Sequence, residues 1–121
     1  MNRLLIVDDA LIMRMKIREL AIRAGWDVVA EGNNGAAAVS LYEEHQPDLV
    51  TLDMVMPEMD GLDALKAIRR VNPEAHVVMV SAVNQKEKLR ECIAAGAADF
   101  IVKPFDPAVL EAFFRNSLQH G

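Results

Sequence analysis

Short, continuously apolar segments alternate along this chain with longer segments in which apolar residues recur every three or four positions. The continuous runs are typical of strands that are buried on both faces of a parallel sheet. The longer segments have the spacing of helices that bury one face. The predicted strands cover residues 4–7, 28–30, 49–52, 76–80 and 99–102. The predicted helices run from Leu11 to a stop at Gly25, over 36–44, over 62–71, over 85–95, and from Pro107 towards Leu118.

The strict alternation of five strands with five helices predicts an α/β fold. Each crossover returns the chain to start a parallel strand, and such crossovers are right-handed. We therefore expect a doubly wound, five-stranded parallel sheet with helices on both faces. Because the sequence shows no internal repeat, low-complexity tract or linker, we expect one domain over residues 1–121.

Charge and composition narrow the classes of function. The net charge of −5 and the pI near 5.1 argue against nucleic-acid binding through bulk electrostatics. The single cysteine, Cys92, cannot form an intramolecular disulfide, which is typical of a reducing compartment. The apolar run at 4–7 is too short for a signal peptide, and no run approaches the roughly 20 residues of a membrane span. We expect a cytoplasmic protein that binds neither nucleic acid nor membrane.

Polar side chains follow four of the predicted strands at their carboxyl ends. Asp8 and Asp9 follow the first strand, and Asp53 follows the third. Ser81 follows the fourth strand and Lys103 the fifth. The carboxyl ends of parallel strands lie along one edge of an open α/β sheet, where ligands bind. We expect three carboxylates, a hydroxyl and an ammonium to share one site.

Three carboxylates at one site predict a bound cation, because like charges disfavour joint ionisation unless a cation compensates them. Mg²⁺ prefers oxygen ligands and is commonly held by one or two carboxylates plus a phosphate. Lys103 can pair with Asp53, and Ser81 can donate a hydrogen bond to an oxygen delivered there. A carboxylate nucleophile in such surroundings suits phosphoryl transfer.

Each of these residues also has a simpler explanation. Asp8 or Asp9 alone would cap the following helix, and Asp53 alone would be a turn residue. Ser81 alone would be another cap, and Lys103 alone a solvated lysine. These explanations do not account for the occurrence of all five residues at the ends of four separate strands.

Four segments together resemble one known family. They are residues 6–9 (IVDD), 56–61 (MPEMDG), 80–82 (VSA) and 100–105 (FIVKPF). Their order and spacing resemble the receiver domain of two-component response regulators, over essentially the whole chain. The nearest likeness is to single-domain, chemotaxis-type (CheY-like) members. The resemblance implies a flavodoxin-like sheet with the strand order 2-1-3-4-5.

The resemblance implies a role for each acidic residue. Asp53 would accept a phosphoryl group from the histidine of a sensor kinase. Asp8 and Asp9 would hold Mg²⁺ together with Asp53, with Asp9 the more direct ligand and Asp8 acting partly through water. The backbone carbonyl of Val55 would complete the protein ligands.

Three further positions would respond to the phosphoryl group. Lys103 would contact it, and Ser81 would move to hydrogen-bond it. Phe100 occupies the place of a switch aromatic that turns inward when the hydroxyl moves. The Lys103–Pro104 peptide bond would be cis.

Two positions depart from some relatives. Phe100 lacks the hydroxyl of a tyrosine, so it cannot offer that hydrogen bond to a partner. Val55 is apolar where some relatives have asparagine. We expect slower self-dephosphorylation, because Val55 cannot help to orient the attacking water.

A single-domain receiver signals through its surface, which the resemblance places on the fourth helix, fifth strand and fifth helix. The last two helices carry more apolar residues than one buried stripe needs, namely Leu89, Ile93, Val109, Leu110, Phe113 and Phe114. Core packing of Phe113 and Phe114 is the alternative to a partner contact.

The favoured function is a phosphorylation-switched binding module of a two-component system, and not an enzyme in the sense of turnover. Its phosphodonor would be a sensor histidine kinase, and its target a chemotaxis protein such as the flagellar motor switch. We expect a monomer that can dimerise on phosphorylation. The alternatives are a phosphorelay intermediate and a receiver domain from a longer DNA-binding regulator. Rivals of another class are a small Mg²⁺-dependent aspartyl phosphatase and a flavodoxin-like cofactor binder.

Overall fold

The computed structural model describes residues 2–82 and 86–118, in which strands and helices alternate strictly. The strands are β1 (Arg3–Val7), β2 (Asp27–Gly32), β3 (Leu49–Asp53), β4 (Val77–Ala82) and β5 (Asp99–Lys103). The helices are α1 (Leu11–Arg23), α2 (Gly35–His45), α3 (Gly61–Val71), α4 (Lys86–Ala94) and α5 (Pro107–Asn116). All ten elements expected from the sequence are present.

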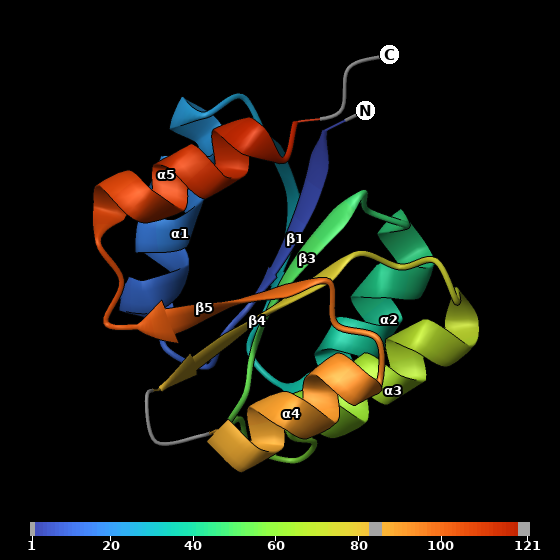
Figure 1. Cartoon of the computed structure of the whole chain (residues 1–121). Helices are drawn as coiled ribbons and strands as arrows, with labels where there is room; N and C mark the ends of the chain where they lie inside the picture. The colour runs from blue at the N-terminus through green and yellow to red at the C-terminus, as the bar shows by residue number, and fades with distance from the viewer. Residues whose placement is uncertain (1, 83–85, 119–121) are drawn as a thin grey trace.

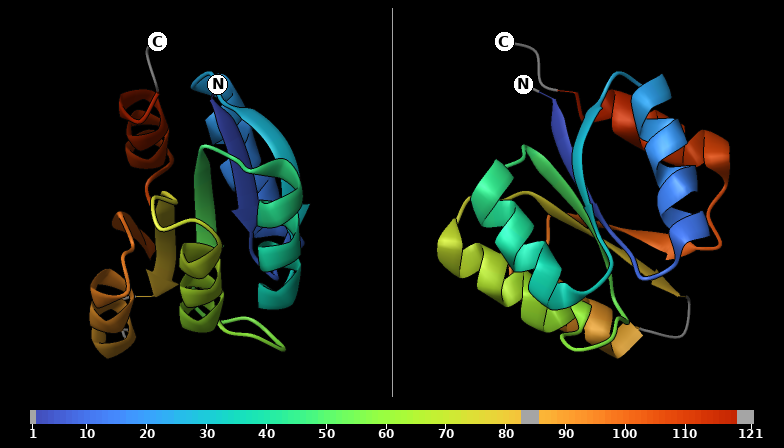
Figure 2. Two further views of the ribbon diagram at one scale, coloured as in Figure 1. Left: turned by 90° about the vertical axis from the view of Figure 1, so that its right-hand side faces the viewer. Right: turned by 180° about the vertical axis from the view of Figure 1, so that it is seen from behind.

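The strands form one parallel sheet in the order β2-β1-β3-β4-β5, which confirms the predicted topology. Helices α1 and α5 cover one face of this sheet, and α2, α3 and α4 cover the other (Figures 1 and 2). Because all the strand pairs are parallel, the carboxyl ends of the strands lie at one edge of the sheet, which the arrowheads of β4 and β5 mark in Figure 1.

Some element boundaries differ from the expected ones. Strand β2 is longer at both ends, because its backbone continues to pair with β1 beyond the apolar residues that marked it. Strand β4 continues through Ser81 to Ala82. Helix α5 ends at Asn116, short of Leu118. Helix α4 begins at Lys86 within the described part, and the expected first residue, Gln85, lies outside the described residues.

Two hydrophobic cores, one on each face, hold the sheet. The larger core lies under α2, α3 and α4, and the smaller one lies under α1 and α5. Phe114 is fully buried in the smaller core, where its carbonyl accepts a 2.8 Å hydrogen bond from the Trp26 indole. Leu110 is also buried there. Core packing, the alternative to a partner contact, therefore holds for Phe114, because α5 turns the side that carries Leu110 and Phe114 toward the sheet.

Side chains begin three of the helices. Asn34, Asp60 and Asp106 each accept a hydrogen bond from a backbone N–H in the first turn of α2, α3 and α5, respectively. Among the helices whose N-cap residue is described, α1 is the exception, because Ala10 stands at its N-cap position and offers no side-chain acceptor. Its start must be held by other contacts.

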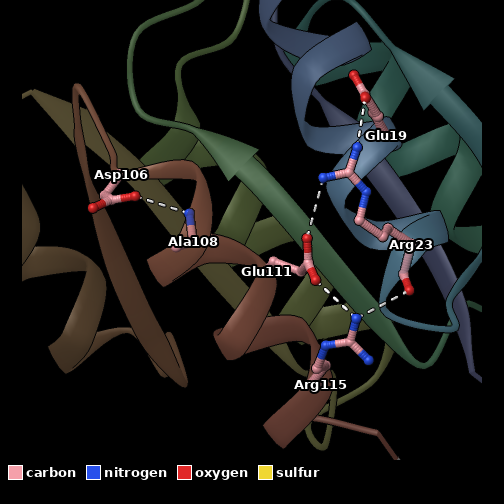
Figure 3. Close-up of polar contacts among 6 residues, drawn as sticks. All are labelled: Glu19, Arg23, Asp106, Ala108, Glu111 and Arg115. Atoms are coloured by element: carbon pink, nitrogen blue, oxygen red, sulfur yellow. Dashed lines mark hydrogen bonds and ion pairs between the residues drawn. The ribbon is translucent and has the colours of Figure 1, made fainter.

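Charged side chains join α1 to α5 at the surface. Arg23 lies between Glu19, at 2.9 Å, and Glu111, at 3.4 Å (Figure 3). Arg115 donates to Glu111 at 2.8 Å and reaches the Arg23 carbonyl at 3.5 Å. The hydrogen bond from Arg115 is the main reason why the pKa of Glu111 is lowered. These contacts fix α5 against α1 outside the core.

None of the helices in the described part of the chain is long and apolar enough to cross a membrane.

Candidate functional site

Three carboxylates meet at the carboxyl edge of the sheet. Asp8 and Asp9 directly follow β1, and Asp53 is the last residue of the neighbouring strand β3. Each of the three offers a carboxylate oxygen, and these oxygens all lie within 4.8 Å of one another. Asp8 is fully buried and Asp53 is 7% exposed, whereas Asp9 is exposed to solvent. The structure thus brings the three predicted acidic residues together.

Lys103 joins this cluster from the last strand. The register of β5 on β4 pairs Lys103 with Ala82, at the same edge of the sheet. Its Nζ lies 3.0 Å from Asp8 Oδ2 and 3.2 Å from Asp53 Oδ1. Burial by itself lowers the pKa of an ammonium, but here the hydrogen bond to Asp8 and the charges of Asp53 and Asp8 outweigh it, so the pKa of Lys103 is raised. Lys103 is therefore an ion-paired group, and the solvated-lysine alternative is wrong.

Asp53 is held in unfavourable surroundings for a negative charge. Burial raises its pKa to about 6, and the charge of Asp8 acts in the same direction. The Lys103 ammonium opposes this shift without cancelling it. A carboxylate in this state gains from any additional cation, because a cation would compensate the charge that burial penalises.

Asp8 is fixed through four of its polar atoms. Its Oδ1 accepts a hydrogen bond from the Ala10 N–H at 2.9 Å, while Oδ2 takes the bond from Lys103. Its backbone N–H donates to the Gly32 carbonyl at 3.1 Å, and its carbonyl accepts from Arg14 at 2.7 Å. Asp8 does not occupy the N-cap position of α1, so the capping alternative is wrong for this residue.

The segment after Asp53 folds back tightly over the end of β3. The Gly61 N–H donates to the Met54 carbonyl at 2.8 Å. A Cβ atom at Gly61 would meet the Asp53 carbonyl oxygen and would lie 2.8 Å from Met54 Cα. Only glycine allows this approach. Val55, between the two, has a 56% exposed side chain.

The response regulator receiver domain family matches this chain over residues 4–115. The chain belongs to this family. As a receiver domain, it takes part in phosphorylation-switched two-component signalling. Family membership favours this function over the aspartyl phosphatase and the cofactor binder.

Curated relatives of this receiver domain include two chemotaxis proteins. The CheY protein of Bacillus subtilis is 54% identical over 92% of this chain and 93% of its own length. The CheY protein of Thermotoga maritima is 50% identical over the same shares of the two chains. Among solved structures, CheY in a complex with CheX, BeF₃ and magnesium from Borrelia burgdorferi is 33% identical, with a TM-score of 0.87. That match covers 97% of this chain and 90% of the other.

In the described part of the receiver domain, Ser81 and Phe100 form no hydrogen bond with the three carboxylates of the site. Ser81 is buried in β4, and its hydroxyl donates to the Ala82 carbonyl at 2.9 Å. Phe100 lies in β5 and is 41% exposed. The capping alternative for Ser81 is wrong, because the residue lies inside a strand. The Lys103–Pro104 peptide bond is cis, as expected.

The apolar surface over α4, β5 and α5 is smaller than the sequence suggested. Ile93 and Val109 are exposed, at 49% and 63%, whereas Leu89 and Phe113 are partly buried against the two cores. Phe100 and Val102 of β5 are also exposed. The sequence analysis counted neither residue among the apolar residues of this surface, although it gave Phe100 a role as the switch aromatic. They line a groove of about 320 Å³ together with residues of α5.

Two contacts of the site were missed by the sequence analysis. Nothing in the sequence pattern of the first helix distinguishes Arg14 from its other cations, such as Lys16 and Arg18. Gly61 appeared only as the last residue of the segment 56–61. Neither role has a local signal, since both depend on a backbone carbonyl of another element.

Proposed function

We propose that Asp53 is the phospho-acceptor of this receiver domain, with a sensor histidine kinase as its donor. The observation that supports this role is the environment of the Asp53 carboxylate. It lies at the open edge of the sheet, 3.2 Å from the Lys103 ammonium and within 4.8 Å of two other carboxylates. The exposed Asp9 beside it leaves one side of the site accessible.

In the proposed transfer, an oxygen of the Asp53 carboxylate attacks the phosphorus of a phosphohistidine. A phosphorus–oxygen bond forms, the phosphorus–nitrogen bond breaks, and the imidazole nitrogen leaves with the bonding pair. Negative charge accumulates on the oxygens around phosphorus, so the reaction depends on positioning and charge compensation. Lys103 supplies a positive charge directly beside the attacking oxygen. Ser81 would turn from the Ala82 carbonyl to donate to the new phosphoryl group.

The donor set fits a divalent cation that prefers oxygen ligands. Asp8, Asp9 and Asp53 would hold Mg²⁺ together with the backbone carbonyl of Val55. When bound, the ion would compensate the charge of the phosphoryl oxygens. The raised pKa of Asp53, which is caused first by burial and then by the charge of Asp8, supports this proposal, because a bound cation would favour the charged carboxylate.

The proposed output surface lies over α4, β5 and α5. Its exposed apolar side chains are Ile93, Phe100, Val102 and Val109. Movement of Ser81 would make room for Phe100 to turn inward and so change this surface. The relatives named above support chemotaxis as the pathway. The flagellar motor switch is the proposed target.

Residues 1–121 form one receiver domain that acts in the cytoplasm as a monomer and can dimerise on phosphorylation. The protein turns over no external substrate beyond accepting and losing its own phosphoryl group.

The intact mass of the protein after incubation with acetyl phosphate and Mg²⁺ tests this function. We expect wild type to gain about 80 Da, the mass of one phosphoryl group, and to lose it on standing. Asp53→Asn removes the nucleophile in a side chain of similar shape and should gain nothing. Asp27→Asn is the matched control at the exposed start of β2 and should behave as wild type. An adduct on Asp53→Asn, or none on wild type, would contradict the assignment.

A further inference from the structure

Arg14 connects the acidic site to two other elements from within α1. Its Nη1 donates a 2.7 Å hydrogen bond to the backbone carbonyl of Asp8. Its Nε lies 3.4 Å from Glu31 Oε1, near the end of β2. This second contact is an ion pair without a hydrogen bond, because the buried Nε has no hydrogen-bond partner in the described structure. The Arg14 side chain is only 16% exposed, which is unusual for an arginine.

The Asp8 carbonyl belongs to the peptide unit that joins Asp8 to Asp9. A hydrogen bond to this carbonyl fixes the plane of that unit, and with it the direction in which Asp9 leaves Asp8. The same plane therefore sets how two of the three carboxylates lie relative to each other. The absence of a side-chain cap on α1 adds weight to this contact, because the turn between β1 and α1 depends on the bonds of Asp8.

Glu31 compensates the positive charge of Arg14, which lies close to a site that is expected to bind a metal cation. An unpaired guanidinium would repel a metal ion and weaken its binding. Glu31 lies against Arg14 at 3.4 Å and against Arg18 at 3.9 Å, so the arginine is paired with a negative charge. Arg14 can then act mainly as a hydrogen-bond donor. The planar, permanently charged guanidinium is suited to serve both contacts at once.

We infer that Arg14 is a positioning residue for the magnesium site, which acts through the Asp8–Asp9 peptide unit and touches no ligand carboxylate. The inference rests on the proposed function, because it assigns a role in binding the Mg²⁺ that this function requires.

Arg18 provides a matched control one helical turn further along. It shares Glu31 with Arg14, but its side chain is 57% exposed and forms no hydrogen bond or ion pair with Asp8 in the described structure. Arg14→Met removes the donor and keeps an apolar stem of similar length. Arg18→Met removes a charge from the same helix face and leaves the Asp8 carbonyl paired.

The test is the dissociation constant for Mg²⁺, measured by isothermal titration calorimetry on wild type and both variants. Loss of a contact that orients metal ligands commonly weakens affinity by 10- to 100-fold, so we expect about a tenfold increase for Arg14→Met and less than about twofold for Arg18→Met. Unchanged affinity in Arg14→Met, or an equal loss in Arg18→Met, would overturn the inference. If wild type itself fails to bind Mg²⁺, the proposed function fails, and the role in magnesium binding fails with it.

A second measurement separates positioning from a general loss of folding. The Asp9 N–H belongs to the same peptide unit as the Asp8 carbonyl, so its ¹⁵N chemical shift reports the hydrogen bond without any metal. We expect this signal to move in Arg14→Met, with EDTA present, and to stay in place in Arg18→Met. If Arg14→Met does not fold, Arg14→Leu replaces it, since leucine also keeps an apolar side chain and has no hydrogen-bond donor for the Asp8 carbonyl. An unmoved Asp9 signal with wild-type Mg²⁺ affinity in that variant would overturn the inference.

Discussion

Lys103 Nζ lies between Asp8 Oδ2, at 3.0 Å, and Asp53 Oδ1, at 3.2 Å, so one ammonium links the ends of β1 and β3. The ammonium therefore compensates two buried carboxylates, and it also occupies the surroundings that a metal ion must share. Its removal should affect stability and metal binding in opposite directions.

Lys103→Met should make the metal-free protein less stable and its Mg²⁺ affinity higher. Two buried carboxylates lose their partner, which should lower the free energy of unfolding by about 1–3 kcal/mol. Without the Lys103 ammonium, no fixed positive charge repels Mg²⁺ from the carboxylates, so its affinity should rise. Urea unfolding in EDTA and a Mg²⁺ titration measure the two effects. Lys88→Met, which breaks only a surface pair with Asp60, is the control, and weaker Mg²⁺ binding in Lys103→Met would contradict this prediction.

The raised pKa of Asp53 predicts how stability changes with pH in the absence of metal. The folded chain binds this proton more tightly than the unfolded chain, whose carboxyl has a pKa near 3.8. The resulting stabilisation is full below pH 3.8 and is lost as the pH rises through about 6. Asp53→Asn has no such loss, so it should exceed wild type by about 1–3 kcal/mol at neutral pH.

Urea unfolding of wild type and Asp53→Asn in EDTA, between acidic and neutral pH, checks this prediction. The difference between the two proteins should grow as the pH rises through about 6. Asp27→Asn controls for the removal of one negative charge. A constant difference at all pH values would show that Asp53 does not titrate in this range.

Gly61→Ala should destabilise the protein and disturb the acceptor. The new Cβ would meet the Asp53 carbonyl oxygen and lie 2.8 Å from Met54 Cα, and neither backbone atom can move away easily. We expect a loss of about 2–4 kcal/mol in the free energy of unfolding. Gly32→Ala is the control, because there the nearest atom is the end of the flexible Leu41 side chain, at 3.2 Å. Equal losses in the two variants would refute the close-approach explanation.

Val55→Asn should shorten the lifetime of the phosphoryl group. The side chain at this position is 56% exposed beside the acceptor, so an amide there can hydrogen-bond a water that attacks the phosphorus. The decay of the intact-mass adduct after removal of acetyl phosphate measures the rate. Val55→Leu is a control without hydrogen-bonding groups, and the idea is refuted if the asparagine and leucine variants decay at the same rate as wild type.

Cys92 should resist alkylation in the native protein. It is fully buried in the larger core, with Sγ 3.6 Å from Met54 Sδ, and burial raises the pKa of its thiol to about 11. Since the thiolate is the reactive form, iodoacetamide at neutral pH should modify Cys92 only after unfolding. Mass spectrometry with and without urea checks this, and rapid labelling of the native protein would contradict it.

The sequence was sufficient to predict the parallel sheet, its helices and the edge that carries the site. These features follow from the alternation of apolar runs with helical segments and from parallel topology. It placed Asp8, Asp9, Asp53 and Lys103 together, since each follows a strand. It did not predict which side of α5 is buried, because apolar residues lie all around that helix, so the choice between core packing and a partner contact stayed open for Phe113 and Phe114. Hydrogen bonds to distant carbonyls, such as that of Arg14 to Asp8, leave no local pattern.

The ion pairs of Lys103 join residues that are far apart along the chain, with 95 positions to Asp8 and 50 to Asp53. A chain emerging from the ribosome displays its acidic residues long before Lys103 exists to join them. The complete site thus requires β1, β3, β4 and β5 to be assembled in one sheet, and such long-range pairing is slow to form. Competence to accept a phosphoryl group is consequently a property of the finished fold, and unfinished chains are excluded from signalling by their topology.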